Sequence, residues 1–339
     1  MTRGAWLTAA LVAGVALVAG CGGEEGTGGP KKGPLTIAVC PKGTMHVFWK
    51  SVHAGAKAAE RELNKDVPPG GTPKVEIIWQ GPVVEDDREA QINLVETFIQ
   101  KRVDGIVLAP LDAKALVAPV RRAKAAGIPV VIIDSALADP EAYVSFVATD
   151  NYKGGVLAGR HMARLLGGKG NVVVLRYLVG SASNERREEG FLAEMARHPG
   201  IRVVSSDQYG GPTVETAMTA AEALLAKFGP GQVQGIFCPN EPMAWGTLRA
   251  LEAARRAGSV KLVAFDTSAR LLEAMDKGYL DGLVLQDPVR MGYEGVRTVV
   301  QHLRGHEVPR RIDTGVVLAT PENRGDPEVA RLLHPPIDR

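Results

Sequence analysis

Short apolar runs rich in valine and isoleucine recur along the chain, and polar residues follow most of them. The runs occupy residues 36–40, 75–80, 105–110, 129–134 and 143–149, and then 171–176, 201–208, 235–240, 261–266 and 282–286. They lack the alternation of polar and apolar residues that a half-exposed strand shows. The pattern therefore predicts parallel strands that are buried on both faces.

Amphipathic stretches separate these runs. In 88–101, Ile92, Val95 and Ile99 recur at helical spacing, which predicts a helix with one apolar face. Gly127 directly precedes the next apolar run and is typical of a helix end. Two successive series of about five strand–helix units predict an α/β protein with two doubly wound parallel-sheet lobes.

The N-terminus has the features of an export signal. Arg3 precedes an apolar run from Ala5 to Ala19, which is shorter than the roughly 20 residues of a spanning helix. Residues 17–21, LVAGC, resemble the lipobox of bacterial lipoproteins, in which the cysteine thiol takes a diacylglycerol. We expect a signal peptide at 1–20, lipidation of Cys21, and a flexible lipid-anchored tether at 21–33. The alternatives are a plain signal peptide or a short N-terminal anchor.

Composition narrows the class of protein. The 339 residues are 45% hydrophobic and 23% charged, which excludes a polytopic membrane protein and a largely disordered chain. The net charge of +2 gives no electrostatic reason to expect nucleic acid as a partner. Cys40 and Cys238 lie in apolar runs, and we expect buried free thiols there, although a disulfide is possible in an oxidising compartment.

Polar and aromatic residues gather where the predicted strands end, which is where open α/β sheets bind ligands. The candidate site residues found in this way are Lys42, His46, Phe48, Trp49, Asp134, Ser135, Asn240, Asp266 and Gln286. They lack the spacing of a zinc site, and the chain has no G-x-S-x-G elbow, P-loop or G-x-G-x-x-G fingerprint. The sequence therefore predicts no metal, no cofactor and no enzymatic activity.

Two adjacent aromatic side chains beside carboxylates and amides are what a sugar site uses, because ring faces stack on C–H groups while hydroxyls need polar partners. Other readings remain open. Asp134 and Asp266 could each cap the following helix. His46 could be a surface residue, Phe48 and Trp49 could belong to the core, and Arg187 could lie on a solvated helix face.

From about Leu35 to Thr320 the chain resembles the pentose- and hexose-binding group of type I periplasmic binding proteins, the ribose-binding protein family. The segments that carry the resemblance are TIAVCPKGTMHVFWKSVHAGAKAA, GIVLAPLDAKAL, GIPVVIIDSAL, VATDNYKGG, GSASNERREEGF, IFCPNEPMAWGTLRAL, LVAFDTS and LVLQDPVRMGYEGV. Together these segments are specific for the family, although each segment alone is weak evidence for the resemblance.

The resemblance implies two lobes that close over a ligand and a hinge of three crossovers, near 149–150, 286–287 and 313–314. The implied organisation is an N-terminal lobe at 34–149 plus 287–313, a C-terminal lobe at 150–286 plus 314–321, and a surface tail at 322–339.

By position, the resemblance makes Asp134, Arg187, Asn240, Asp266 and Gln286 sugar ligands. Phe48 and Trp49 match the aromatic pair of the family, and Tyr209 is the candidate for a further aromatic residue.

The chain departs from the family at Lys42, His46 and Ser135. Its Pro-Lys at 41–42 and Gly-Pro at 81–82 are more similar to the autoinducer-2 receptor, in which the lysine touches the ligand. We expect Lys42 to pair with Asp134 or Asp266 or to meet an electron-rich ligand oxygen. The alternative is that it reaches out to solvent.

The resulting hypothesis is a monomeric, membrane-anchored lipoprotein of the periplasm or cell envelope. It would capture a sugar or sugar-like polyol and deliver it to the permease subunits of an ABC importer, with no nucleic-acid partner. The alternative is a periplasmic sensor that presents its ligand to a membrane signalling receptor.

Two other classes of protein are disfavoured. Regulators of the lac-repressor type carry a helix-turn-helix at the N-terminus, whereas this chain has an export signal there, which argues against a DNA-binding regulator. Asp134, Asp266 and His46 could do acid–base work, but no nucleophile or metal motif supports an enzyme.

Overall fold

The computed structural model describes residues 34–68, 71 and 74–337. The predicted signal peptide, Cys21 and the tether lie outside the described residues. The first half of the described chain contains β1 (Leu35–Cys40), α1 (Val47–Leu63), β2 (Val75–Trp79), α2 (Arg88–Gln100), β3 (Gly105–Leu108), α3 (Val117–Ala125), β4 (Val130–Ile133), a 3-10 turn (Pro140–Ala142) and β5 (Ser145–Ala148).

The second half begins with α4 (Asn151–Leu165), β6 (Gly170–Val174), α5 (Ala182–Met195), β7 (Ile201–Ser205), α6 (Val214–Lys227), β8 (Gly235–Cys238) and α7 (Glu241–Ala253). It continues with β9 (Lys261–Phe265), α8 (Ala269–Asp276), β10 (Gly282–Leu285), α9 (Pro288–Leu303), β11 (Arg311–Asp313), β12 (Val317–Ala319) and α10 (Pro327–Leu333).

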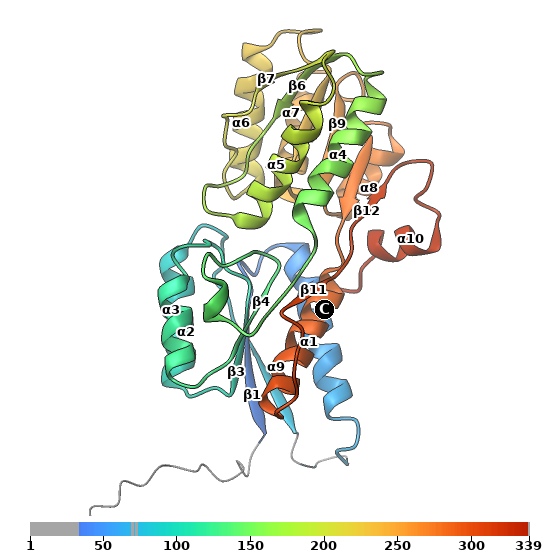
Figure 1. Cartoon of the computed structure of the whole chain (residues 1–339). Helices are drawn as coiled ribbons and strands as arrows, with labels where there is room; N and C mark the ends of the chain where they lie inside the picture. Colours follow the sequence, from blue (N-terminus) through green and yellow to red (C-terminus); the bar gives the residue numbers. More distant parts are fainter. Residues whose placement is uncertain (1–33, 69–70, 72–73, 338–339) are drawn as a thin grey trace, which may run out of the picture. The chain divides into compact units, whose positions relative to one another are not determined.

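Two six-stranded sheets organise these elements (Figure 1). Their strand orders are β11-β5-β4-β3-β1-β2 and β12-β10-β9-β8-β6-β7, so the order reverses beside β1 in one sheet and beside β6 in the other. All ten apolar runs form strands, and the predicted α/β architecture with two doubly wound lobes is confirmed. Ligand sites in such sheets lie at the reversal point.

Two short strands were not predicted from the sequence. β11 pairs with β5 in parallel, whereas β12 runs antiparallel to β10, with Leu283 opposite Ala319. The sheets are thus largely but not wholly parallel. Three connections pass between the sheets: from β5 to α4, from β10 to α9, and from β11 to β12.

Helices cover both faces of each sheet, and successive strand residues face opposite layers. In β1, Ile37 and Val39 pack with the layer of α1 and α9, while Ala38 and Cys40 pack with the layer of α2 and α3. The second sheet has α4 and α5 on one face and α6, α7 and α8 on the other. Burial on both faces explains why the strands are uniformly apolar.

The C-terminal segment differs from the surface tail that the sequence suggested. α10 buries Val329, Leu332 and Leu333 against the second lobe. The Arg331 guanidinium lies 2.8 Å from the Asp287 carboxylate, and the Thr267 hydroxyl donates to the Leu333 carbonyl at 3.3 Å. A seven-residue helix gives too little periodicity to be recognised among the prolines and charges around it.

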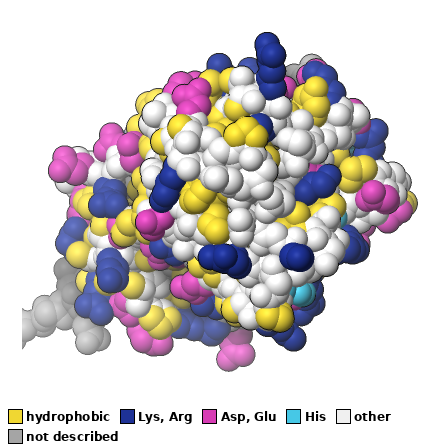
Figure 2. All heavy atoms as spheres, turned by 90° about the horizontal axis from the view of Figure 1, so that it is seen from above, with side chains coloured by type: hydrophobic (Ala, Val, Ile, Leu, Met, Phe, Trp, Pro, Cys, Tyr) yellow, Lys and Arg dark blue, Asp and Glu magenta, His cyan; other side chains and the backbone are white. Residues whose placement is uncertain are grey.

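Cys40 and Cys238 are buried free thiols, as expected. They lie in β1 and β8, which belong to different sheets, and burial raises the pKa of each thiol to about 12. Within the described residues no helix has the length and apolar character needed to cross a membrane. On the face in Figure 2, acidic and basic side chains are interspersed with apolar ones.

Close helix pairs hold each lobe together, and glycines make them possible. A Cβ at Gly292 of α9 would lie 2.0 Å from the Val52 carbonyl oxygen of α1, and one at Gly155 of α4 would lie 2.0 Å from the Arg187 carbonyl oxygen of α5. No side chain fits at such distances. These glycines therefore set the separation of α1 from α9 and of α4 from α5.

We predict that Gly292→Ala lowers the free energy of unfolding by about 3 kcal/mol, because the added methyl forces α9 away from α1. Urea denaturation followed by circular dichroism measures this change. The control is Gly325→Ala, where the added methyl meets open space. Equal stability of the two variants would contradict the proposed role of the contact.

Candidate functional site

A cavity lies between the two lobes, at the carboxyl ends of their strands. It contains about 320 Å³ of atom-free space, including the part that is open to solvent. Its lining residues are Lys42, His46, Phe48, Trp49, Glu85, Asp134, Ser183, Asn184, Arg187, Asn240, Asp266 and Gln286. The structure thus brings together all the candidate site residues except Ser135 and the further aromatic candidate Tyr209.

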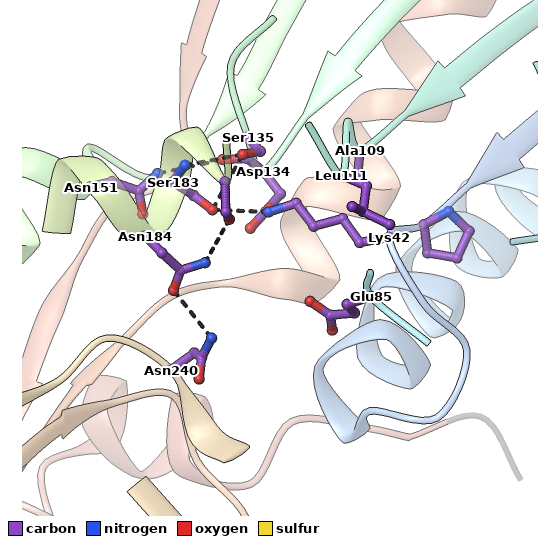
Figure 3. Close-up of polar contacts among 12 residues, drawn as sticks. Lys42, Glu85, Ala109, Leu111, Asp134, Ser135, Asn151, Ser183, Asn184 and Asn240 are labelled. Atoms are coloured by element: carbon purple, nitrogen blue, oxygen red, sulfur yellow. Dashed lines mark hydrogen bonds and ion pairs between the residues drawn. The ribbon is translucent and has the colours of Figure 1, made fainter. Parts of the chain in front are cut away.

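Lys42 reaches into the cavity and forms a buried ion pair. Its Nζ lies 2.8 Å from Oδ2 of Asp134, and the side chains are 3% and 4% exposed (Figure 3). The expected pairing with Asp134 is therefore confirmed, and the solvent-directed alternative is wrong. The same Nζ donates to the Ser183 hydroxyl at 3.0 Å, across to the other lobe.

Ser135 does not line the cavity but holds Ser183, the residue that Lys42 contacts. Its hydroxyl accepts from the Ser183 amide at 3.0 Å and donates to the Ser183 hydroxyl at 3.3 Å. Ser183 lies in the first turn of α5, so a loop of the first lobe satisfies an amide that has no partner within the helix. The two serines therefore join the lobes beside the ion pair.

Asp134 and Asp266 follow β4 and β9 at matching places in the two lobes. Both have left-handed backbone conformations, with φ of 61° and 66°. Neither caps the following helical segment, whose N-caps are Asp139 and Ser268. Aspartate tolerates this conformation better than most residues, and such strain is concentrated at functional sites.

Arg187 is buried and held on several sides. Its Nε donates to Oδ1 of Asn151 at 2.8 Å, and its NH1 donates to the Pro239 carbonyl at 2.8 Å. The guanidinium also lies over the Phe265 ring at 4.4 Å. Since only 2% of the residue is exposed, the solvated-face alternative is wrong.

Asp266 is the partner of Arg187 and Gln286. Its Oδ2 lies 3.6 Å from Arg187 NH1, and its Oδ1 accepts from Gln286 Nε2 at 2.7 Å. Burial raises the pKa of the Asp266 carboxyl, although the arginine and the amide oppose this effect. Oε1 of Gln286 is buried without a hydrogen-bond partner among the described residues. Gln286 lines the cavity, so this unpaired acceptor belongs to its wall.

Asn240 has two roles. Its Oδ1 accepts from the Met243 amide at 3.2 Å and caps α7, while its Nδ2 donates to Oδ1 of Asn184 at 3.2 Å. Asn184 in turn donates to the Ser181 hydroxyl at 2.8 Å. The cap fixes the position of the amide, and the pair presents polar groups to the cavity (Figure 3).

The aromatic pair belongs to both the core and the cavity wall. Phe48 and Trp49 meet edge to face with ring centroids 5.0 Å apart, and Trp49 is part of the core of the first lobe. His46 precedes α1, and its Nδ1 lies 3.9 Å from Glu85 Oε1. The indole of Trp49 donates to the same Glu85 oxygen at 2.7 Å.

Sequence reasoning missed Glu85, Ser183 and Asn184. Glu85 follows β2 and accepts at 3.0 Å from the Tyr177 hydroxyl of the other lobe. Ser183 and Asn184 follow β6 after a loop. Ligands bind beyond the carboxyl ends of strands. A search of the residues that follow β2 and β6 would therefore have found all three. Tyr209, the candidate aromatic residue, does not line the cavity and instead accepts from Arg176 NH1 at 3.0 Å.

Two of the three carboxylates that line the cavity each face a cation, and amides and aromatic rings complete its wall. Each lobe supplies an aspartate, and each aspartate faces a cation. Among the described residues no cluster of three or more histidine, cysteine or acidic side chains is arranged to hold a metal. Such a site suits a neutral ligand that is rich in hydroxyl groups.

We predict that Lys42→Met lowers the free energy of unfolding by about 3 kcal/mol, because it leaves the Asp134 carboxylate buried without a counter-ion. The double variant Lys42→Met/Asp134→Asn removes both charges and should regain most of that loss in urea denaturation. Lys277→Met, which breaks an exposed pair with Glu273, is the control and should change little. A double variant no more stable than Lys42→Met would refute the pairing argument.

Comparison with known proteins identifies the family. Residues 37–307 match the family described as periplasmic binding protein domain. The D-ribose/D-allose-binding protein of Pseudomonas aeruginosa is 31% identical over 294 residues, which cover 84% of this chain and 88% of that protein.

Solved structures agree with this result. An ABC transporter solute-binding protein from Agrobacterium vitis with bound D-fucose has a TM-score of 0.81 and 35% identity, covering 88% of this chain and all of that one. A carbohydrate transporter solute-binding protein from Agrobacterium radiobacter in complex with D-arabinose has a TM-score of 0.82 and 31% identity, covering 90% of this chain and all of that one. The chain belongs to the periplasmic binding protein family, among the sugar-binding solute-binding proteins of ABC transporters, which are not enzymes.

Proposed function

We propose that the chain binds a neutral monosaccharide or sugar-like polyol in the interlobe cavity and delivers it to the permease subunits of an ABC importer, while a lipid on Cys21 holds it at the membrane. The observation that carries the proposal is the composition of the cavity wall. Two aspartates, an arginine, amide side chains and an aromatic pair meet there, drawn from both lobes.

Hydrogen-bonding capacity supports a polyhydroxylated ligand. A sugar hydroxyl both donates and accepts, so it needs acceptors and donors in the same place. Asp266 supplies a carboxylate acceptor, the unpaired Gln286 Oε1 supplies a second acceptor, and Arg187 supplies the N–H donors that Asn151 and Pro239 do not use. Burying such groups without a partner costs about 1–3 kcal/mol each, which a fitting hydroxyl would recover.

Charge balance supports a neutral ligand over an anion. The Lys42 ammonium is compensated by Asp134 and the Arg187 guanidinium by Asp266. An added carboxylate would leave one negative charge without a buried counter-ion. Because Lys42 has three N–H donors and uses two on Asp134 and Ser183, one remains for a ligand oxygen.

The relatives favour the same ligand class. The proteins reported above bind D-ribose or D-allose, D-fucose and D-arabinose, all of which are neutral monosaccharides. Lys42, His46 and Ser135 depart from the ribose-type pattern that the sequence resembles. The ligand of this chain is therefore a sugar or polyol whose oxygens match a lysine at this position.

We predict that D-ribose, D-allose, D-arabinose or D-fucose raises the melting temperature of the protein, since ligands that bind the folded state stabilise it.

We also predict that Asp266→Ala weakens binding of the best of these sugars about 5- to 100-fold, as measured by isothermal titration calorimetry. Asp276→Ala, at an exposed position outside the cavity, is the matched control and should bind normally. If no sugar of the panel binds, the proposed function is wrong.

The lipid anchor is tested separately. We predict that Cys21→Ser moves the protein from the membrane fraction to the soluble fraction and abolishes incorporation of labelled palmitate, because the thiol is the attachment point. Cys238→Ser, which alters a thiol buried in β8, should still be labelled. Equal labelling of the Cys21 variant would exclude this anchor and leave sugar binding untouched.

A further inference from the structure

A second hollow opens directly beside the candidate sugar cavity. It holds about 1390 Å³ of atom-free space, including the part that is open to solvent, and both lobes contribute to its walls. His46 and Glu85 line both spaces and therefore form their common boundary. These two side chains therefore separate a molecule in the small cavity from the larger space.

The walls of this hollow are mainly apolar. Met45, Val83 and Val84 line it from the first lobe, and Val214 and Trp245 line it from the second. Met45 is 69% exposed and Val83 is 63% exposed, which is unusual for neighbouring large apolar side chains. Single exposed apolar residues are common, but several around one hollow mark a binding surface.

Charge at the hollow disfavours an acidic occupant. Glu85, Glu215 and Glu241 line it, against Arg270 and His46 as the groups that can be positive. The Arg270 guanidinium already lies over the Trp245 ring, 5.4 Å from its centroid. An occupant with a carboxylate or phosphate would face an excess of negative charge, whereas a neutral apolar ring would contact the valines and the indole.

We propose that this hollow accommodates an apolar ring attached to the sugar, so that the preferred ligand is a glycoside with an aromatic or apolar aglycone instead of a free monosaccharide. The inference rests on the proposed function, since the sugar part occupies the interlobe cavity. Nδ1 of His46 and Oε1 of Glu85 lie 3.9 Å apart, so the glycosidic bond passes between them only when one of the two side chains moves aside. Glu85 is fixed by Trp49 and Tyr177, whereas His46 makes no hydrogen bond to it at 3.9 Å and is the more adaptable side of this passage.

The test compares a free sugar with its own glycosides. Whichever of D-ribose, D-allose, D-arabinose and D-fucose binds best is measured by calorimetry beside its two anomeric p-nitrophenyl glycosides. Burial of the ring predicts that one anomer binds at least about tenfold more tightly than the free sugar. If the free sugar binds and both glycosides bind more weakly, the inference is overturned while the proposed function stands.

A matched pair of variants locates the ring. Val83 and Val179 are both 63% exposed, but only Val83 lines the hollow. Val83→Glu should weaken binding of the glycoside at least about fivefold and leave binding of the free sugar unchanged, while Val179→Glu should affect neither. Trp245→Ala should show the same selectivity as Val83→Glu.

Other outcomes would overturn the inference. Equal glycoside binding by Val83→Glu and Val179→Glu would remove the ring from this hollow. If Val83→Glu keeps its affinities but impairs stimulation of the transporter ATPase, the apolar rim is a docking surface for the permease instead. Failure of both free sugar and glycoside to bind would refute the proposed function, and the inference with it.

Discussion

The buried ammonium of Lys42 sets the condition that the rest of the site must meet. A positive charge with almost no exposure needs a counter-ion, and Asp134 supplies it at 2.8 Å. The remaining donors of the ammonium need acceptors, and the Ser183 hydroxyl of the other lobe provides one. Full satisfaction of Lys42 therefore requires both lobes, so separating them would force water to replace a protein hydrogen bond.

The second lobe repeats this arrangement with other residues. Asp266 occupies the place after β9 that Asp134 occupies after β4, with the same left-handed backbone, and faces Arg187. Asn151, at the start of α4, connects the two halves, since it accepts from Arg187 and donates to the Asp134 carbonyl at 3.4 Å. The lobes show no obvious sequence repeat, yet each brings one aspartate and one cation to the cavity.

Local patterns predicted the strands and most of the cavity wall, because buried parallel strands are uniformly apolar and their ends gather at one edge. The pairing of particular side chains was harder to predict. The Tyr177–Glu85 contact joins residues 92 positions apart, and no local spacing encodes it. β12 and α10 were missed for another reason: elements of three and seven residues are too short for a hydrophobic period to show.

The two buried thiols have a consequence for labelling chemistry. Cys40 and Cys238 are enclosed in strands of separate sheets, and burial raises the pKa of each to about 12, so almost no thiolate exists at neutral pH. Maleimide dyes react with thiolates that solvent can reach. In a protein that begins after Cys21, one new surface cysteine on each lobe would therefore accept a dye without removal of the native cysteines. Lobe movement then becomes accessible to fluorescence energy transfer in an otherwise unaltered chain.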